Sequence, residues 1–412
     1  MSDRVYIIGV GMTKFGKFLE KSYKEFTREA LNLVLKDCGL TNSDIEAAWF
    51  SNSGWGGSEE QHCIRGQVAL SANGLDGIPI TNVENACASG STALHSAWTA
   101  VKAGLYDCVL AIGVEKLYNE NRSKTMNGFI SGTDVEETKR AMAMIKEMIE
   151  AQRKEAAKNG GGDKKPGGHS VFMDFYAIGA RMHMEKYGTT QRQLAVIASK
   201  NHNNAVMNPL AQYTFAQSVE EVLQDREVAY PLTRGMCAPI GDGAAAAILC
   251  SGKFLKRHPS GRAIRILASV LRSGKRGGPD DICKRTSDAA YNMAGLGPKD
   301  INVAEVHDAT AFGELHQSEQ MGFCPVGEGG PFAESGATAI NGKIPINPSG
   351  GLISRGHPIG ASGLAQVHEL VTQLRGEAGP RQVQNCRIAL AENGGGFLGM
   401  GEAAMGIHIL GK

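Results

Sequence analysis

The chain has 412 residues, a length that suggests two or three domains rather than one small core. Its formal net charge of +1 gives no attraction to a polyanion, and no run of about 20 apolar residues is present, so neither nucleic acid nor a membrane is an expected partner. Its nine cysteines show no CxxC pair and no zinc-like spacing with histidine, which argues against a disulfide framework or a metal site and favours a cytoplasmic protein. The N-terminal residues lead directly into an expected strand, so no targeting segment is expected.

The first half of the chain alternates strand-like runs with helical patterns, which indicates an α/β fold. The expected strands cover residues 5–10, 47–51, 108–113 and 243–250, and the expected helices cover residues 26–40, 93–101, 174–187 and 191–204. Gly39 and Gly104 are expected to end the first two of these helices. The last strand is rich in alanine, which is typical of a closely packed central strand.

Residues 119–186 form an excursion from this alternation. Within it, residues 135–158 are rich in Met, Lys and Glu at helical spacing, and residues 159–168 have the composition of a loop or disordered segment. The methionines are expected to pack as the apolar face of an ordinary amphipathic helix. The alternative is an adaptable surface for an acyl group or a partner.

A second round of strands and helices begins near residue 262. Its expected strands cover residues 263–271, 301–306, 387–391 and 403–410, and its expected helices cover residues 315–322 and 363–374. The order of elements, rather than a sequence repeat, predicts two similar α/β halves, residues 1–255 and residues 256–412.

Cys87 is the first candidate for a chemical role. It precedes a run of small residues, 88–91, that leads into an apolar helix. The dipole and N–H groups at a helix N-terminus favour a thiolate, and the same N–H groups can hold an acyl oxyanion. This position predicts a nucleophile for covalent acyl transfer, and the alternative is a buried structural cysteine.

Two histidines are further candidates. His357 follows Gly356 on a glycine-rich loop that enters a helix, where its imidazole could take a proton from Cys87 or donate to an oxyanion; the alternative is a turn histidine. His307 follows an expected strand, and strand ends are frequent site positions in α/β sheets, so we expect it at the site. Asp308 is expected to cap the helix that follows it, and the alternative is that its side chain orients an imidazole.

A triple glycine, residues 394–396, follows the expected strand at residues 387–391. A glycine turn at this place would let the backbone pass close to a thioester. Glu392 comes just before the glycines, either as a solvated turn carboxylate or as a catalytic base in a pocket.

These stretches resemble the thiolase superfamily over essentially the whole chain. The matching segments, in order, are residues 85–90 around Cys87, His307-Asp308, residues 356–360 around His357, and the triple glycine. The match is closest to the sterol-carrier or lipid-transfer branch, in which a His-Asp pair replaces an Asn-Glu pair. The resemblance implies two similar βαβαβαββ halves in five αβαβα layers, usually in a dimer, with residues 119–186 as a loop domain over the pocket.

The resemblance also implies the chemistry. Cys87 would carry the acyl group, His357 would activate Cys87, and His307 with His357 would help form an oxyanion hole. Coenzyme A would be a co-substrate, and no metal would be needed. The expected binding positions are Gly356, Gly394 and Gly395. We therefore expect a thiolase-type acyl-CoA C-acyltransferase that cleaves a 3-oxoacyl-CoA with free coenzyme A, or runs the reverse Claisen condensation.

The chain departs from the family pattern at two positions. Degradative thiolases place a second cysteine where this chain has Glu392, and lipid-transfer thiolases place one where it has Ala309. Some group must still move the proton of the α-carbon, and the candidates are His307 and Glu392. For Glu392 to do so, burial would have to raise its pKa from the usual value of about 4.3. Similar losses occur in thiolase-like chains that work with a small zinc-ribbon and OB-fold partner, so such a partner subunit is a hypothesis for this chain.

Two other functions are open at this stage. One is a C-acyltransferase or retro-aldolase that acts on a ring or sterol carbon and needs no free coenzyme A. The other is a non-catalytic coenzyme A- or lipid-binding subunit, which the missing cysteines favour and which Cys87 and His357 oppose. The aromatic content of 6% gives no ring-stacking signature for a substrate.

Overall fold

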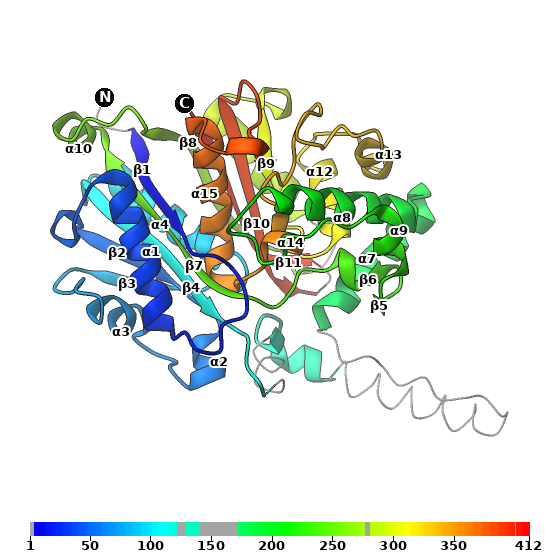
Figure 1. Ribbon diagram of the computed structural model, residues 1–412, viewed down its shortest axis with the longest axis horizontal. Helices are drawn as coiled ribbons and strands as arrows, with labels where there is room; N and C mark the ends of the chain where they lie inside the picture. The colour runs from blue at the N-terminus through cyan, green and yellow to red at the C-terminus, as the bar shows by residue number, and fades with distance from the viewer. Residues whose placement is uncertain (1–3, 122–128, 141–170, 277–280, 400) are drawn as a thin grey trace.

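A computed structural model describes residues 4–121, 129–140, 171–276, 281–399 and 401–412. Its centre is a nine-stranded mixed sheet with the strand order β3-β2-β4-β7-β1-β8-β11-β10-β9 (Figure 1). These strands are β1 (Val5–Met12), β2 (Ala47–Ser51), β3 (Ile80–Val83), β4 (Cys108–Lys116), β7 (Asp242–Ser251), β8 (Ile264–Ser273), β9 (Val303–Glu305), β10 (Ile388–Leu398) and β11 (Gly401–Gly411). A separate ribbon consists of β5 (Glu227–Ala229) and β6 (Leu232–Thr233). The α/β class predicted from the sequence is confirmed.

The sheet is built from two halves with the same strand order. In the N-terminal half, β2, β4, β7 and β1 are neighbours in that order; in the C-terminal half, β9, β10, β11 and β8 are. The directions match as well, because only the first pair in each set of four is parallel. The N-terminal half adds β3, which pairs with β2 in parallel. Strands β1 and β8 join the halves through the pairs Tyr6–Arg265 and Ile7–Ile264. The division expected between residues 255 and 256 lies within α10 (Gly252–Arg257), and it stays a prediction.

Helices separate the two halves of the sheet and cover their outer faces. Helices α4 (Ser89–Lys102) and α15 (Ser362–Arg375) share one apolar core with strands of both halves. On the outer faces, α1 (Tyr23–Cys38) and α3 (Arg65–Ser71) pack on the N-terminal half, and α11 (Ile282–Ala294) packs on the C-terminal half. The molecule therefore has the five layers that the thiolase resemblance implied.

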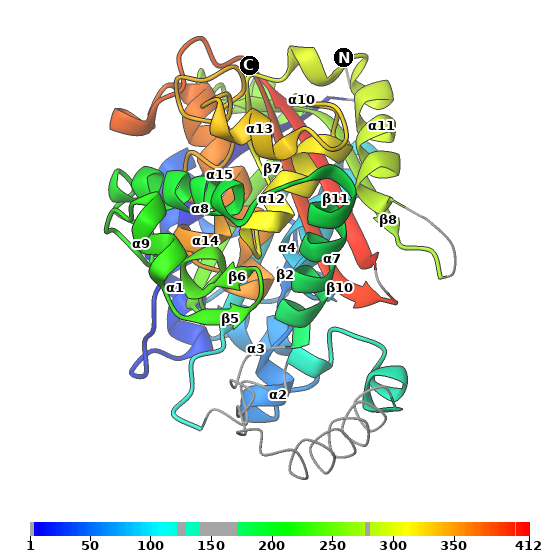
Figure 2. The same ribbon diagram turned by 90° about the vertical axis from the view of Figure 1, so that its right-hand side faces the viewer.

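A further group of helices packs around its own apolar core at one side of the sheet (Figure 2). Its members are α7 (Val171–Tyr187), α8 (Gln191–Val206), α9 (Val219–Gln224), α12 (Ala311–Gln320), α13 (Gly329–Glu334) and α14 (Gly351–Arg355). The short helix α2 (Trp55–Glu59) lies in the N-terminal half. No helix in the described part of the chain is both long and apolar enough to cross a membrane.

Local sequence signals explain where the best-predicted helices begin and end. Ser22 caps α1, because its hydroxyl accepts a hydrogen bond from the Glu25 N–H while the Glu25 carboxylate accepts one from the Ser22 N–H. Gly39 follows α1 and Gly376 follows α15, both in the left-handed conformation that glycine adopts without a steric penalty. The predicted end of the first helix at Gly39 is confirmed.

Two local predictions were wrong. The triple glycine is not a turn, because Gly394 and Gly395 lie inside β10 and pair with Met405 and Ala404 of β11. Asp308 does not cap α12; its carboxylate accepts a hydrogen bond of 2.6 Å from a backbone N–H at the start of α14. The hydroxyl of Thr310 caps α12 instead.

The prediction for the excursion was tested only in part. Residues 135–140 are helical, but most of the expected helix at residues 135–158 and all of the expected loop at residues 159–168 lie outside the described residues. Neither β3, a strand of 4 residues, nor the amphipathic helix α11 was predicted from the sequence.

Candidate active site

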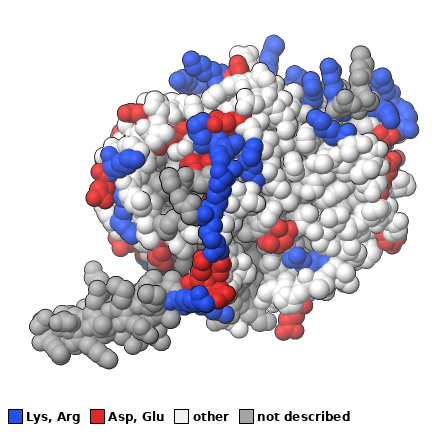
Figure 3. Space-filling model, turned by 180° about the vertical axis from the view of Figure 1, so that it is seen from behind, with Lys and Arg blue, Asp and Glu red and all other residues white. Residues whose placement is uncertain are grey.

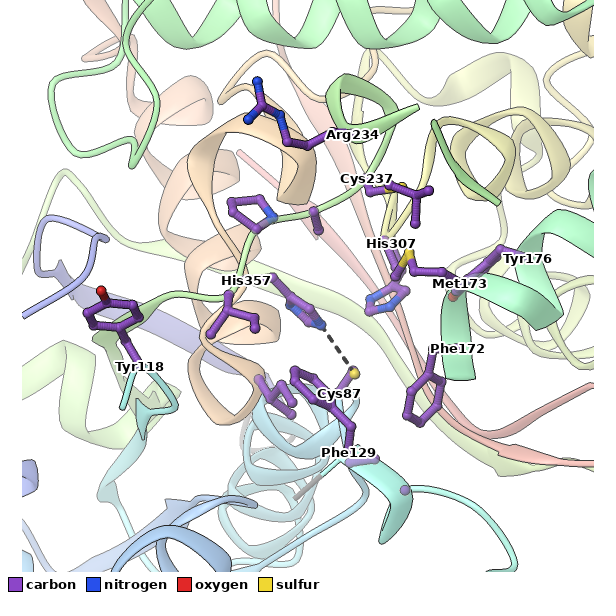
Figure 4. Close-up of a pocket in the computed structure, with 18 of the residues that line it drawn as sticks. Cys87, Tyr118, Phe129, Phe172, Met173, Tyr176, Arg234, Cys237, His307 and His357 are labelled. Atoms are coloured by element: carbon purple, nitrogen blue, oxygen red, sulfur yellow. Dashed lines mark hydrogen bonds between the residues drawn. The ribbon is translucent and has the colours of Figure 1, made fainter. Parts of the chain in front are cut away.

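A cavity of about 780 Å³ lies where the two halves meet (Figure 4). Cys87 reaches it from the loop before α4, His307 from the segment that follows β9, and His357 from the loop before α15. One nitrogen of each histidine and the sulfur of Cys87 all lie within 4.8 Å of one another. The structure thus brings together three of the four residues that the sequence predicted to be catalytic.

The loop that carries Cys87 is held in a strained, close-packed turn. Ala86 has a φ of 48°, in the left-handed region, where a residue with a Cβ costs about 1–2 kcal/mol. Strand β10 lies against this loop: a Cβ on Gly395 would overlap the Asn85 carbonyl and lie 2.9 Å from the Ala88 Cβ. Gly395 is therefore required for the close approach of β10 to the Cys87 loop.

The hydrogen bonds of His357 define which of its nitrogens carries the proton. Its Nδ1 lies 2.7 Å from the Ser362 Oγ, and the single hydroxyl hydrogen of Ser362 is donated to the Pro358 carbonyl at 3.0 Å. Nδ1 must therefore be the donor in the first bond, which leaves the Nε2 lone pair free. This Nε2 lies 3.2 Å from the Cys87 Sγ, so His357 can accept the thiol proton (Figure 4).

Both members of this pair are electrically neutral at neutral pH. Burial, followed by the positive charges that His307 and Arg355 can carry, holds the pKa of His357 well below its usual value. Burial raises the pKa of the Cys87 thiol to about 12, and the nearby Glu402 carboxylate adds to this rise, while a hydrogen bond from the Gly396 backbone N–H opposes it. Burial therefore opposes the resting thiolate that the helix N-terminus was expected to favour.

His307 lies beside His357, with its ring centroid 5.2 Å away and the two rings nearly perpendicular. The Asn393 amide Nδ2 donates to its Nδ1 at 3.1 Å, so with this amide orientation the Nε2 carries the hydrogen. Burial and the Arg355 charge lower the pKa of His307 to about 3. His307 is thus a neutral hydrogen-bond donor, as an oxyanion hole requires.

Glu392, the fourth predicted residue, is not on the cavity wall. It is fully buried, and its Oε2 accepts a hydrogen bond of 2.8 Å from the His307 backbone N–H. Burial, together with the Glu402 carboxylate, raises the pKa of Glu392 well above its usual value. Among the glycines predicted for coenzyme A binding, Gly395 lines the cavity, whereas Gly356 is covered by Gln212 and Gly394 by Glu402.

Glu402 is a cavity residue that the sequence analysis missed. It lies at the start of β11 and pairs with Phe397 of β10, and both residues line the cavity. Burial raises the pKa of its carboxyl to about 7. No local motif marks this glutamate, because its position depends on the register of the β10–β11 hairpin.

Aromatic side chains gather on one wall of the cavity. The rings of Phe172 and Phe397 have centroids 5.5 Å apart, and Phe129 and Tyr176 contact the same group. The spacing of Phe172 and Tyr176, four residues apart on α7, was the available sequence signal. The low aromatic content was therefore misleading, since these few rings are concentrated at the cavity.

Cationic side chains also line the cavity. They are Lys17, Arg226 and Arg234. Arg234 forms an ion pair of 3.1 Å with Asp225, and its side chain stays largely exposed. The cavity therefore combines an apolar wall and a thiol–imidazole pair with positive charges.

The chain belongs to the thiolase family. Residues 5–226 match the thiolase N-terminal domain, and residues 280–412 match the thiolase C-terminal domain-like family. It is 38% identical to an acetyl-CoA acetyltransferase of Methanothermobacter thermautotrophicus, with 99% of both chains covered. It is also 37% identical to sterol carrier protein 2 of Bos taurus (98% of this chain, 72% of the relative) and 35% identical to benzoylsuccinyl-CoA thiolase subunit BbsB of Thauera aromatica (96% of each).

Solved structures show the same fold at lower identity. An Ltp2-ChsH2(DUF35) aldolase superposes with a TM-score of 0.76 at 21% identity, covering 100% of this chain and 98% of the other. Human mitochondrial 3-ketoacyl-CoA thiolase in complex with CoA gives a TM-score of 0.69 at 15% identity, with 100% and 98% covered.

Proposed function

We propose that this protein is a coenzyme A-dependent thiolase-type acyltransferase that cleaves a 3-oxoacyl-CoA with free coenzyme A, or runs the reverse condensation, through an acyl group on Cys87. The observation that carries this proposal is the 3.2 Å approach of the His357 Nε2, with its lone pair free, to the Cys87 Sγ. The names of the relatives, an acetyltransferase and a thiolase subunit, support the same reaction class.

In the cleavage direction, His357 takes the Cys87 proton while the sulfur attacks the 3-keto carbon. The neutral pair makes this a concerted transfer, because neither a thiolate nor an imidazolium exists beforehand. The oxyanion that forms accepts hydrogen bonds from the His307 Nε2–H and the newly protonated His357. The bond between C2 and C3 then breaks, the acyl group stays on Cys87, and free coenzyme A finally removes it.

Coenzyme A is the proposed co-substrate, and its phosphates would bind the cations of a cavity that also carries carboxylates, among them Glu120 and Asp225. Lys17, Arg226 and Arg234 supply cations for its phosphates, and the apolar wall accommodates the acyl group. A human thiolase of the same fold is known in complex with CoA. Gly395 lines the cavity and lets β10 pack directly on the Cys87 loop, whereas Gly356 and Gly394 leave space for the side chains of Gln212 and Glu402.

We also propose that the chain works as a homodimer with a small zinc-binding OB-fold partner subunit. The broad area without charged residues on the face seen in Figure 3 is available for a second copy. One relative is named as a subunit, and one structural neighbour is titled with a second component, DUF35. Native mass spectrometry of the protein purified from its own cells tests both assemblies: a monomeric, fully active chain would contradict them.

Peptide mapping after incubation with an acyl-CoA tests the proposed function. We expect the acyl mass on the Cys87 peptide of the wild type, and none in Cys87→Ala. Cys237 is a second thiol of the cavity, with its Sγ 3.3 Å from the Thr233 carbonyl and no imidazole bond, so its peptide provides an internal control and stays unmodified. An acyl group on Cys237 instead of Cys87 would refute the mechanism.

A further inference from the structure

The α-carbon proton has no assigned carrier in this cavity, because both positions where thiolases place a second cysteine hold other residues. The side chain of Glu402 lies flat against β10 and faces the cavity. A Cβ on Gly394 would lie 2.5 Å from the Glu402 Cδ, so a larger residue there would displace this carboxyl. The amide Nε2 of Gln317 lies 3.4 Å from both carboxyl oxygens and orients them.

The surroundings of Glu402 suit a group that both gives and takes a proton. Burial favours the neutral acid, whereas the Gln317 amide and a protonated His316 favour the carboxylate, and these opposing effects give a pKa of about 7. Other titratable groups also interact with Glu402. They are Asp281 before α11, Cys283 on α11, Glu392 on β10, Tyr176 on α7 and Cys87. Both protonation states are therefore populated at neutral pH.

We propose that Glu402 is the catalytic acid and base that moves the C2 proton of the substrate, in place of the second cysteine of other thiolases. This assignment rests on the thiolase-type reaction proposed above. It gives a role to a residue that lines the cavity beside Cys87 and that the remaining mechanism leaves unused.

The proton balance of the cycle closes on two groups, Glu402 and His357. When the bond between C2 and C3 breaks, its electron pair stays on C2 of the departing acyl-CoA enolate, and the Glu402 carboxylic acid donates its proton there. The Glu402 carboxylate then takes the proton of the coenzyme A thiol, whose sulfur attacks the acyl carbon on Cys87. As the Cys87–acyl bond breaks, His357 returns its proton to the Cys87 sulfur.

The two other candidates are less well placed for this step. Glu392 is not on the cavity wall, and one of its oxygens already holds the His307 backbone. His307 has a pKa of about 3, so at neutral pH it offers only a weakly acidic N–H. Glu402 faces the cavity and has a suitable proton affinity.

Exchange of the C2 hydrogens of acetyl-CoA in D₂O, followed by mass spectrometry, tests the assignment directly. We expect Glu402→Gln to lower the exchange rate about 100-fold or more, while Cys87 is still acylated, and Glu402→Asp to restore part of the exchange. Glu392→Gln tests the competing carboxyl, which is buried next to Glu402 but is not on the cavity wall, and we expect it to retain more exchange than Glu402→Gln wherever the variant folds.

Each outcome of this experiment has a defined meaning. The assignment would be overturned if Glu402→Gln exchanged at the normal rate. It would also be overturned if a folded Glu392→Gln lost the exchange that Glu402→Gln kept. Thermal unfolding and Cys87 acylation of Glu402→Gln report whether that variant is intact. A wild type that never acylates Cys87 would instead refute the proposed function, so the two failures are distinguishable.

Discussion

At the scale of single residues, the site depends on where protons reside rather than on fixed charges. Cys87 and His357 face each other as a neutral thiol and a neutral imidazole, because burial raises one pKa and lowers the other. Such a pair reacts when a substrate oxyanion begins to form and stays unreactive otherwise. A slow reaction of Cys87 with a general thiol probe is therefore not evidence for a non-catalytic subunit.

The raised pKa of Cys87 predicts its alkylation kinetics. Since its pKa is about 12, the thiolate fraction should rise about tenfold per pH unit between pH 7 and pH 9. We expect the rate of iodoacetamide labelling at the Cys87 peptide, measured by mass spectrometry, to follow this slope. A fast, pH-independent rate would instead reveal a resting thiolate–imidazolium pair.

Ser362 is a positioning residue for His357. Its hydroxyl accepts the Nδ1–H and thereby keeps the Nε2 lone pair directed at Cys87. We expect Ser362→Ala to slow Cys87 acylation at least about 10-fold, with little change in KM, because the imidazole loses its preferred tautomer. Rapid-quench kinetics measure this rate, and an unchanged rate in a folded variant would exclude the tautomer argument.

The pKa of Glu402 sets the pH dependence of the carbon chemistry. Removal of the C2 proton needs the carboxylate, so the rate of C2 exchange should rise with pH and level off above about 7. Cleavage needs the carboxylic acid, so that rate should fall over the same range. Steady-state pH profiles measure both, and identical profiles for the wild type and Glu402→Gln would contradict this view.

At the scale of elements, the hairpin of β10 and β11 shapes the cavity. Gly394 leaves space for the Glu402 carboxyl, and Gly395 leaves space for the Cys87 loop, so glycine is needed at the two positions for different contacts. From the sequence, these glycines were expected to form a turn that lets the backbone approach a thioester. They lie in β10 instead, and the following strand β11 returns to the cavity and places Glu402 there, ten residues after Glu392.

Substituting Gly395 should separate the hairpin from Cys87. We expect Gly395→Ala to lower the free energy of unfolding by about 1–3 kcal/mol and to slow Cys87 acylation, because the new Cβ would overlap the Asn85 carbonyl. Gly401→Ala is the matched control in the same hairpin, since no atom of the described residues lies within 4 Å of its added Cβ. Denaturant unfolding and acylation assays would contradict the packing argument if the two variants behaved alike.

At the scale of the whole molecule, the site exists only where the two halves meet. Cys87 comes from the N-terminal half, and His307, His357 and Glu402 come from the C-terminal half. Helices α4 and α15 start side by side between them, since a Cβ on Gly90 would lie 3.0 Å from the Leu364 nitrogen. This close contact places the Cys87 loop and the His357 loop at one cavity.

The sequence predicted much of this arrangement, and the omissions have physical reasons. The strand and helix order, Cys87, His357 and His307 could be read from patterns that are local in the chain. Glu402 could not, because its place depends on which residues pair across a hairpin, and the resting state of Cys87 could not, because desolvation is a property of the folded environment.

Single turnover of a 3-oxoacyl-CoA in the absence of free coenzyme A tests the central claim most directly. We expect a burst of one acyl-CoA per active site, the product that keeps C1 and C2 of the substrate, matched by one acyl group on Cys87 and followed by a halt until coenzyme A is added. Continued cleavage without coenzyme A, or a burst without an acyl group on Cys87, would contradict it.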